Sequence, residues 1–441
     1  MYSDKMLLFA LCLIPLLGVV LSVKAQAQER ASLHQSLDLH AMSVESDVIE
    51  WRRDIHANPE LSNREFRTAA LVADHLRSLG MEVQTEIAHT GVVGFLQGGK
   101  PGPIVALRAD MDALPVTEMV DLPFASKVRT TYNGMDVGVM HACGHDTHTA
   151  ILMGVASVMA AMKDELPGSI KFIFQPAEEG APAGEEGGAE LMLREGVFED
   201  PTPEVIFGLH VWPERVGQIS YLPGPFMASA DELHITIKGR QTHGAVPWGG
   251  VDPIVVGSQV VLGLQTIASR QLDVTATPSI ITVGTFHGGV RSNIIPDDVK
   301  LTGTIRTFLP EVREEIEERI RHTVEHIATS AGATAEVQIN YGYPVTVNDP
   351  DLTLQMIPSL ERVSDSVSQA AKITGAEDFS YFANEVPGLF IFLGIAPPEA
   401  DLETVPRNHS PYFYVDESAL ITGVRALSSL AVDYMVDQGS E

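Results

Sequence analysis

The first half of the chain alternates between helical patterns and short apolar runs. Residues 48–79 carry an amphipathic helical pattern that the segment 56–59 (HANP) interrupts, so two helices are expected there. Apolar runs typical of buried strands follow, with helical stretches between them: strands at 91–96, 104–109, 170–175 and 205–211, helices at 147–162 and 187–195. Strands that alternate with helices predict an α/β fold with a mostly parallel sheet.

A different pattern covers residues 227–337. It predicts strand, helix, strand, strand, helix and strand, at 232–239, 253–270, 279–286, 299–308, 310–329 and 335–341. The second helix places its apolar side chains on one face, as a helix packed on a sheet does: Ile316, Ile320, Val324 and Ile327. This βαββαβ order is the ferredoxin-like pattern. Because strand-like and site-like segments resume at 375–379, 388–394 and 408–414, we expect a domain inserted between two parts of a larger one, residues 28–226 and 338–441.

The N-terminus has the features of an export signal. Lys5 precedes an apolar run over residues 6–23, and the segment 25–27 (AQA) supplies small residues for cleavage. We expect removal of residues 1–27, which leaves a periplasmic or secreted chain without stable membrane insertion. The alternative is an uncleaved anchor, although Pro15 and Gly18 make the run poorly suited to that role. We expect no other segment to be long and apolar enough to span a bilayer.

Net charge and cysteine content limit the classes of function that this chain can have. The 441 residues carry a formal net charge of −29, so phosphate backbones are repelled and nucleic acid is not an expected partner. Loss of residues 1–27 also removes Cys12, which leaves Cys143 as the only cysteine and allows no intramolecular disulfide. An unpaired thiol in an exported protein indicates either metal ligation or cysteine catalysis.

The most informative segment is 140–150 (MHACGHDTHTA). Cysteine and histidine are preferred ligands for zinc and related ions. On an extended backbone Cys143 and His145 point to the same side, so both can reach one ion. A purely structural loop is the alternative for this segment.

Carboxylates and a histidine follow the predicted strands. Asp110 and Asp112 come after one strand, Glu178 and Glu179 after the next, and His210 lies near the end of another. Ligands of parallel sheets bind beyond the carboxyl ends of the strands, where these side chains are expected to meet. On an extended backbone one glutamate ligates a metal while the other faces water as a general base. The alternative is a solvated acidic loop.

Several further candidates are ordinary residues when taken singly. His409 lies in a loop near the C-terminus, and a histidine at the position of His210 is more often a rim residue than a ligand. His243 and Asn293 fall in loops of the inserted domain. Arg306, on a predicted strand, is suited to bind a carboxylate, with a surface salt bridge as the alternative.

Five motifs in order resemble one known family. They are 140–150 (MHACGHDTHTA), 174–180 (FQPAEEG), 208–211 (GLHV), 375–380 (GAEDFS) and 408–411 (NHSP). The set is similar to the co-catalytic metallopeptidase and aminoacylase family, in the branch of hippurate hydrolases and auxin amino-acid conjugate hydrolases. The resemblance runs from about residue 48 to the C-terminus and implies that the inserted domain is a lid and dimerisation domain.

The resemblance implies the roles of individual residues. Two divalent metal ions, zinc or manganese with cobalt or nickel as alternatives, are held by the matching positions Cys143, His145, Glu179, His210 and His409. Glu178 matches the general base that activates water, and His243 matches the histidine that stabilises the oxyanion. Asn293 and Arg306 match the positions that bind the substrate and its carboxylate.

The resemblance also implies the reaction and the assembly. The expected reaction is metal-assisted hydrolysis of N-acyl amino acids or short peptide-like amides, by a homodimer or homo-oligomer. Asp110, Asp112 and Asp146 are expected to orient histidine ligands.

Two other functions are compatible with parts of this pattern. Cys143 acting as a nucleophile with His141 or His145 as base leaves the glutamates and later histidines unexplained. A periplasmic metal- or amino-acid-binding protein without catalysis does not need Glu178.

Overall fold

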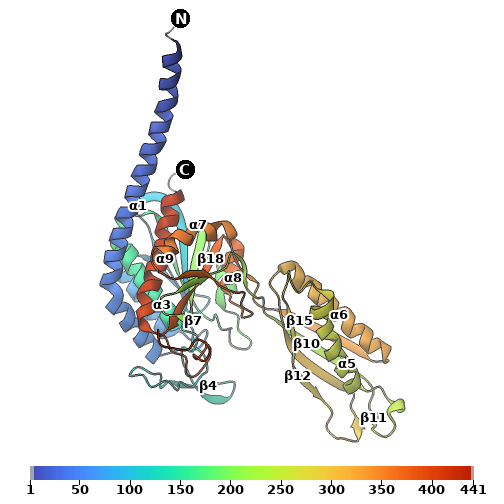
Figure 1. Cartoon of the computed structure of the whole chain (residues 1–441). Coiled ribbons are helices and arrows are strands. Elements are labelled where there is room, and N and C mark those ends of the chain that lie inside the picture. Colours follow the sequence, from blue (N-terminus) through green and yellow to red (C-terminus); the bar gives the residue numbers. More distant parts are fainter. Residues whose placement is uncertain (1–3, 439–441) are drawn as a thin grey trace. The chain divides into compact units, whose positions relative to one another are not determined.

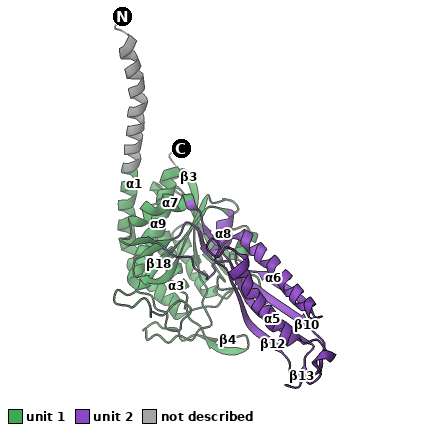
Figure 2. Cartoon of the chain, turned by 45° about the vertical axis from the view of Figure 1, so that its right-hand side comes forward, with its two compact units in different colours: residues 1–221, 351–369, 386–441 green, residues 222–350, 370–385 purple. Residues whose placement is uncertain are grey.

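A computed structural model describes the backbone of residues 4–438 and the side chains of residues 28–438. The chain divides into a first unit, Met1–Tyr221 with Asp351–Gln369 and Val386–Glu441, and a second unit, Leu222–Pro350 with Ala370–Glu385 (Figure 2). Each unit has its own hydrophobic core. The side chains of the predicted export signal lie outside the described residues.

An eight-stranded sheet forms the centre of the first unit. Its strands lie in the order β1 (Glu82–Ile87), β2 (Gly91–Leu96), β6 (Pro167–Gln175), β3 (Lys100–Asp110), β7 (Val205–Arg215), β18 (Gly388–Ala396), β8 (Ile219–Tyr221) and β17 (Val367–Gln369). The four central strands β6, β3, β7 and β18 are parallel, and antiparallel pairs flank them. The predicted mostly parallel sheet is confirmed.

The central strands are apolar because they are buried on both faces. Every residue of β18 is buried, and β6 and β7 are buried over most of their length. The pairing register places Asp110 opposite Gln175 and His210 opposite Phe392. The carboxyl ends of β3 and β6 therefore lie beside the part of β7 that carries His210.

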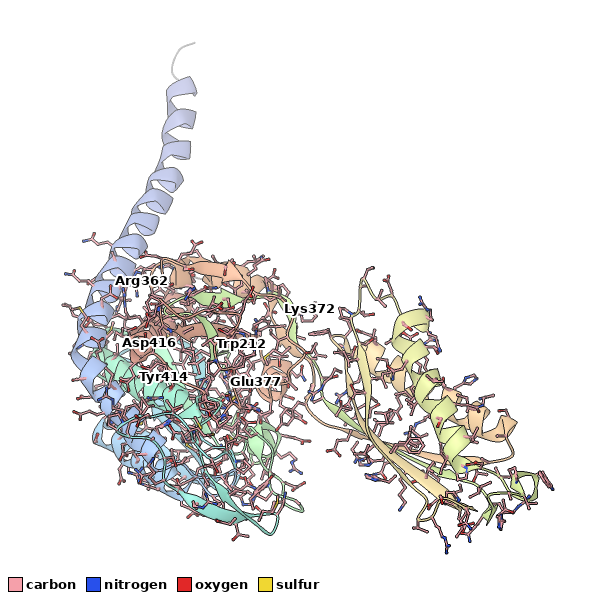
Figure 3. The ribbon with its side chains drawn as sticks, turned by 60° about the horizontal axis from the view of Figure 1, so that its bottom comes forward. Trp212, Arg362, Lys372, Glu377, Tyr414 and Asp416 are labelled. Atoms are coloured by element: carbon pink, nitrogen blue, oxygen red, sulfur yellow. The ribbon has the colours of Figure 1, made fainter. Side chains whose placement is uncertain are left out.

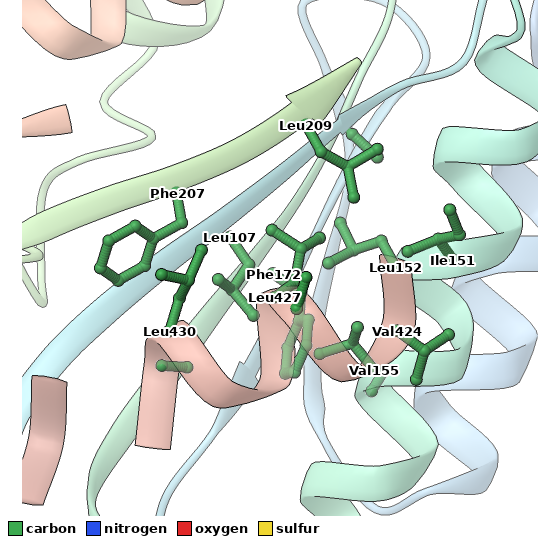
Figure 4. Packing of buried hydrophobic residues seen from close by; sticks show 14 of the residues in the cluster. Leu107, Ile151, Leu152, Val155, Phe172, Phe207, Leu209, Val424, Leu427 and Leu430 are labelled. Carbon is green, nitrogen blue, oxygen red and sulfur yellow. The ribbon is translucent and has the colours of Figure 1, made fainter. Parts of the chain in front are cut away.

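Helices α3 (His145–Ala161) and α9 (Leu420–Gln438) pack against this sheet, and α1 (Asp4–Ala57) packs on both of them (Figure 1). Side chains of α3 and α9 interlock with Leu107, Phe172 and Phe207 of the sheet (Figure 4). The segment Glu417–Gln438 is long and apolar enough to cross a membrane, contrary to our expectation from the sequence, but 83% of its apolar window is buried. It is therefore the core helix of this unit.

Helix α1 begins well before the predicted residue 48. Leu33, Leu37 and Ala41 recur every four residues, and all three are buried against the core of the first unit. Polar contacts hold the same stretch, because His34 Nε2 lies 2.7 Å from Asp433 Oδ1 on α9. The helical pattern therefore extends upstream of the first predicted helix.

The remaining elements of the first unit are shorter. They are the hairpin of β4 (Arg129–Tyr132) and β5 (Met135–Gly138), the helices α2 (Phe66–Ser78), α4 (Gly188–Arg194) and α7 (Pro350–Glu361), and the 3-10 turns Lys163–Glu165 and Glu417–Ala419. The interruption at 56–59 separates α1 from α2, as predicted.

The second unit contains a ferredoxin-like sheet. Its antiparallel strands lie in the order β12 (Ile280–Gly288), β14 (Asp298–Arg306), β10 (Asp231–Lys238) and β15 (Thr334–Tyr341). Helices α5 (Pro253–Thr266) and α6 (Pro310–Ser330) pack on the sheet, and α6 contributes the buried residues Ile316, Ile320 and Val324. The predicted βαββαβ order is confirmed.

The second unit extends beyond residues 227–337. A limit at residue 337 falls inside β15, which ends at Tyr341 because its pairing with β10 continues to Asp231. The unit also includes the pair of β9 (Gly224–Met227) and β16 (Thr346–Asn348), the pair of β11 (Thr242–His243) and β13 (Ile294–Ile295), and α8 (Phe379–Glu385).

Candidate metal centre

Five predicted ligands converge in the first unit. The ligand atoms of Cys143, His145 and His210 lie within 4.8 Å of one another, and the same holds for Cys143, Glu179 and His409. Cys143 Sγ is 3.3 Å from His210 Nε2, and His409 Nε2 is 3.1 Å from Glu179 Oε1. The two groups share Cys143, so this is one continuous cluster of metal-ligating atoms.

Cys143 and His145 do not lie on an extended backbone, so that part of the prediction is wrong. His145 begins helix α3, and Gly144 has a left-handed conformation with φ of +95°. A Cβ at this glycine would lie only 2.3 Å from Val211 Cγ2. A tight turn that only glycine fits therefore brings the thiol and the imidazole to one site.

Glu178 and Glu179 lie in a turn after β6, and the expected opposite orientation on an extended backbone is also wrong. Glu178 Oε2 and Glu179 Oε1 are 3.8 and 4.0 Å from His145 Nε2, so both carboxylates face the cluster. Ala177 enters the turn with a φ of +53°, a conformation that non-glycine residues rarely adopt. The buried Glu65 accepts a hydrogen bond from the Ala177 amide at 2.9 Å and so holds this strained residue.

Asp112 forms hydrogen bonds with several residues of the cluster and orients a histidine ligand, as predicted. Its Oδ1 lies 3.1 Å from His145 Nδ1, which leaves Nε2 of that ring facing the cluster. The amides of Glu178 and Glu179 donate to Asp112 at 3.1 and 3.0 Å, and Ser62 Oγ donates at 2.7 Å. One buried carboxylate therefore orients three of the candidate site residues.

Asp110 acts on a histidine that the prediction did not use. Its Oδ1 lies 2.6 Å from His148 Nδ1, while Arg108 donates to Oδ2 at 2.7 Å. His148 Nε2 accepts a hydrogen bond from the Val211 amide at 2.9 Å. Since Nε2 accepts, the neutral imidazole of His148 carries its proton on Nδ1, and burial lowers the pKa of His148, which favours this neutral form.

The Val211 peptide joins several candidate ligands. Its carbonyl accepts from His210 Nδ1 at 2.7 Å and from Asn408 Nδ2 at 3.3 Å. Asn408 also donates to the Cys143 carbonyl at 3.1 Å. His409, the next residue, has a φ of +70°. Hydrogen bonds to one strand residue therefore fix the positions of three segments that carry predicted ligands.

Strand β7 continues past His210 instead of ending near it. Trp212, which is labelled in Figure 3, stacks on Phe392 of β18 with ring centroids 4.6 Å apart and an interplanar angle of 6°. This aromatic pair keeps β7 and β18 in register next to His210.

Asp146 has a structural role, and the expectation that it orients a ligand is wrong. Its Oδ2 lies 2.8 Å from His56 Nδ1 and 2.9 Å from Arg52 Nε, both on α1. All three side chains are buried. Asp146 therefore connects the start of α3 to α1.

Substitution of His148 is expected to weaken metal binding, because the imidazole holds the peptide that follows His210. In His148→Asn the side chain can still donate a hydrogen bond to Asp110, but it offers no acceptor to the Val211 amide. In His148→Gln the longer side chain places its carbonyl oxygen near the former position of Nε2, where it can accept from Val211. We expect His148→Asn to lower metal affinity by about 10- to 100-fold and His148→Gln to lower it less. Competition with a metal chelator measures the affinity, with the exposed His326→Asn as control. Unchanged affinity in His148→Asn contradicts the role.

The electrostatics of the cluster suit cations. Burial and the carboxylates Glu179 and Glu178 raise the pKa of the Cys143 thiol well above its ordinary value. Reactive cysteines need an electropositive environment, so this setting disfavours Cys143 as a nucleophile. Burial lowers the pKa of His145, but the carboxylates of Asp110 and Asp112 outweigh this effect and raise the pKa to about 10.

The donor set fits divalent metal ions. His145 Nε2 is buried without a hydrogen-bond partner among the described residues, and it faces two carboxylates. Thiolate, imidazole and carboxylate donors together match zinc and related transition metals. Several carboxylates are buried close together at this site, and buried negative charges need nearby positive charge to compensate them.

The other three predicted site residues belong to the second unit. His243 is exposed on β11 and pairs with Ile294 of β13, directly beside Asn293. The Gly244 amide donates to the Asn293 carbonyl at 2.8 Å, so these two loops are joined. Arg306 ends β14 and is partly buried.

Comparison with known proteins identifies the family. The model of Peptidase family M20/M25/M40 matches residues 106–433. The chain is 40% identical over 407 residues to Thermostable carboxypeptidase 2 of Saccharolobus solfataricus, covering 91% of this chain and 99% of that protein. It is 36% identical over 411 residues to IAA-amino acid hydrolase ILR1-like 5 of Arabidopsis thaliana, covering 91% of this chain and 90% of that protein.

A solved structure agrees with these relatives. The Bacillus subtilis YXEP protein, a dinuclear metal binding peptidase from the M20 family, matches with a TM-score of 0.76 and 34% identity, covering 89% of this chain and 99% of that one. The resemblance inferred from the five motifs is confirmed. The chain thus belongs to peptidase family M20/M25/M40 and is a metal-dependent hydrolase.

Proposed function

We propose that this enzyme hydrolyses the amide bond of N-acyl amino acids and short peptide-like substrates. The observation that carries the proposal is the position of Glu178, whose carboxylate lies 3.8 Å from His145 Nε2 beside the cluster of predicted ligands. A buried carboxylate next to metal ligands is placed to exchange a proton with water.

Two divalent ions would be held by Cys143, His145, Glu179, His210 and His409. When bound, such ions polarise the substrate carbonyl and lower the pKa of water. The thiolate favours zinc, while manganese, cobalt and nickel remain alternatives. Asp112 and the Val211 peptide keep the protein ligands oriented.

Glu178 accepts a proton from the attacking water and returns it to the leaving amine. The Glu178 amide donates to Asp112, which anchors the turn that carries the carboxylate, and the side chain of Glu178 is 8% exposed. The carboxylate of Glu178 can therefore contact water while the backbone of the turn stays fixed.

His243 is proposed to stabilise the oxyanion, from this subunit or from a partner subunit. Its Nδ1 accepts a hydrogen bond from the Ala245 amide at 2.9 Å, so the neutral ring carries its proton on Nε2. A donor on an exposed imidazole is what this role needs. Arg306 makes no ion pair among the described residues and is proposed to bind the substrate carboxylate, with Asn293 beside His243 as a further substrate contact.

Location and assembly are proposed on separate grounds. Lys5, the apolar run 6–23 and the segment 25–27 support export to the periplasm or the medium after cleavage. A homodimer or homo-oligomer is proposed from the family resemblance.

Metal removal tests the function directly. The mature protein is expected to hydrolyse N-acetyl- and N-benzoyl-amino acids, to lose this activity on chelation, and to regain it with zinc or manganese. The metal content before and after treatment serves as the control. Activity that persists in protein shown to be free of metal contradicts the proposal.

A further inference from the structure

A cavity of about 510 Å³ lies between helix α2 and the turn that joins β1 to β2, within the first unit. Its walls are formed by α2, by the end of β1 with the turn that follows, and by Glu195. None of the predicted metal ligands or substrate-binding residues lines it. Pockets of about 300–1,000 Å³ commonly hold small organic molecules, so the cavity is large enough for a ligand of its own.

One wall of the cavity is apolar and belongs to helix α2. Phe66, Ala69, Ala70 and Ala73 line it, and their spacing places all four on one face of the helix. Phe66 is 63% exposed, which is a large exposed area for an aromatic side chain. Because the three alanines are small, this face leaves room for a ring beside Phe66.

The opposite wall is negatively charged. Glu86 and Glu195 line the cavity, and neither forms an ion pair among the described residues. The guanidinium of Arg77, on the same cavity, lies 3.3 Å from Asp74 and is therefore already paired. Excess carboxylates beside an aromatic ring attract a cation, by charge and by cation–π contact, and repel an anion.

The turn between β1 and β2 holds this wall in an unusual conformation. Glu86, Ala88 and His89 have φ of +63°, +48° and +78°, although none of them is glycine. The Ala88 amide donates to Glu195 Oε2 at 2.6 Å, and His89 Nε2 donates to the Glu186 carbonyl at 3.0 Å. Strained residues persist where the surrounding structure holds them, and they cluster at ligand-binding sites.

The cavity is connected to the metal centre through Glu65. Thr90, on the wall, donates from Oγ1 to Glu65 Oε2 at 2.5 Å, and Phe66 follows Glu65 in the chain. Glu65 Oε1 accepts from the Ala177 amide at 2.9 Å, at the start of the turn that carries Glu179. One buried carboxylate therefore contacts both a wall of the cavity and the turn that carries a predicted metal ligand.

We propose that this cavity binds a small organic amine with an aromatic body, and that its occupancy is linked to metal binding through Glu65. The ring packs on α2 beside Phe66, and the ammonium group faces Glu86 and Glu195. With metal bound at Glu179, the turn that carries this residue is fixed and holds Glu65 in place, so the wall is already ordered when the amine arrives. The metal-loaded protein should therefore bind the amine more tightly than the metal-free protein.

Binding of 2-phenylethylamine to the metal-loaded protein, measured by calorimetry, tests the site. We expect saturable binding, much weaker binding of ethylamine, which lacks the ring, and no binding of 3-phenylpropionate, which carries the opposite charge. Ala70→Trp fills the cavity from an exposed position of α2 and is expected to raise the Kd at least about tenfold. Glu195→Gln keeps an acceptor for the Ala88 amide but removes a charge, and is expected to raise the Kd about two- to fivefold.

Matched controls and a second pair of variants complete the test. Leu354→Trp, at an exposed position of α7, and Glu190→Gln, at an exposed position of α4, should leave the Kd unchanged. The Kd is expected to be at least about fivefold lower in the metal-loaded than in the metal-free protein. Thr90→Val lacks the hydroxyl that contacts Glu65 and should reduce this difference, whereas Thr90→Ser keeps the hydroxyl and should preserve it.

The outcomes distinguish the site from its link to the metal centre. Absence of saturable binding by 2-phenylethylamine, or a Kd that Ala70→Trp leaves unchanged, overturns the site. Equally tight binding of 3-phenylpropionate overturns the assignment of a cationic ligand. Equal Kd values with and without metal overturn the link. All of these measurements are made without a substrate, so the proposed function is tested separately, by hydrolysis of N-acyl amino acids.

Discussion

Replacement of Glu178 by glutamine is expected to lower kcat by about 10²- to 10⁴-fold, the usual contribution of a general acid–base group. Glutamine has nearly the same shape but cannot accept and return a proton at neutral pH. The amide of residue 178 still donates to Asp112, so the turn should keep its conformation. Steady-state rates with an N-acyl amino acid measure the effect.

Metal content must be measured on the same preparation, because Glu178 also lies within 4.8 Å of ligand atoms of His145 and Glu179. We expect Glu178→Gln to retain both ions. The exposed Glu190→Gln on α4 is the matched control for a lost carboxylate. Loss of a metal ion in Glu178→Gln would make this residue a ligand, and full activity would remove it from the mechanism.

The Gly144→Ala substitution is expected to have the largest effect on stability. A left-handed conformation costs an L-residue about 1–2 kcal/mol, and overpacking of a core typically costs about 1–3 kcal/mol more. Both apply, because Gly144 has a φ of +95° and its new Cβ would lie 2.3 Å from Val211 Cγ2. The same clash displaces the turn between Cys143 and His145, so metal affinity should fall together with the free energy of unfolding.

Two further variants separate the causes. Val211→Ala removes the clashing methyl group, so in the double variant it should restore the part of the stability that was lost to overpacking. Gly134→Ala, at a φ of +77° with no atom within 4 Å of the new Cβ, reports the conformational cost alone. Denaturation of the metal-free proteins measures these differences. Equal losses in Gly144→Ala and Gly134→Ala would show that the contact with Val211 does not matter.

Hydrophobic periodicity predicted most of the fold because each signal is local. The apolar run at 91–96 coincides with β2, and the helix predicted over 310–329 is α6, Pro310–Ser330. The ferredoxin-like order follows from the sequence of elements alone. The start of α1 was missed because its buried stripe over residues 28–47 is narrow, with Leu33, Leu37 and Ala41 buried, while the apolar residues Leu39 and Met42 are exposed.

The chemistry of the centre was predicted from residue types and from five motifs, but its geometry was not. Alternation on an extended strand was the wrong model for Cys143 and His145, since the left-handed Gly144 sets their directions. The extended-strand model was also wrong for Glu178 and Glu179, because these two residues lie in a turn. Glu65 gave no usable signal in the sequence. His148 and Asn408 lie within two of the five motifs, but no role was predicted for either residue.

The sequence by itself therefore determined the order of elements, the two-part architecture and the set of metal-ligating residue types. These depend on local periodicity and on side-chain chemistry, which a linear chain already contains. Only the tertiary structure decided which carboxylate orients which histidine and how hydrogen bonds to Val211 join three segments. Such relations depend on residues as far apart as Cys143 and Asn408, which packing of the sheet and helices brings to hydrogen-bonding distance.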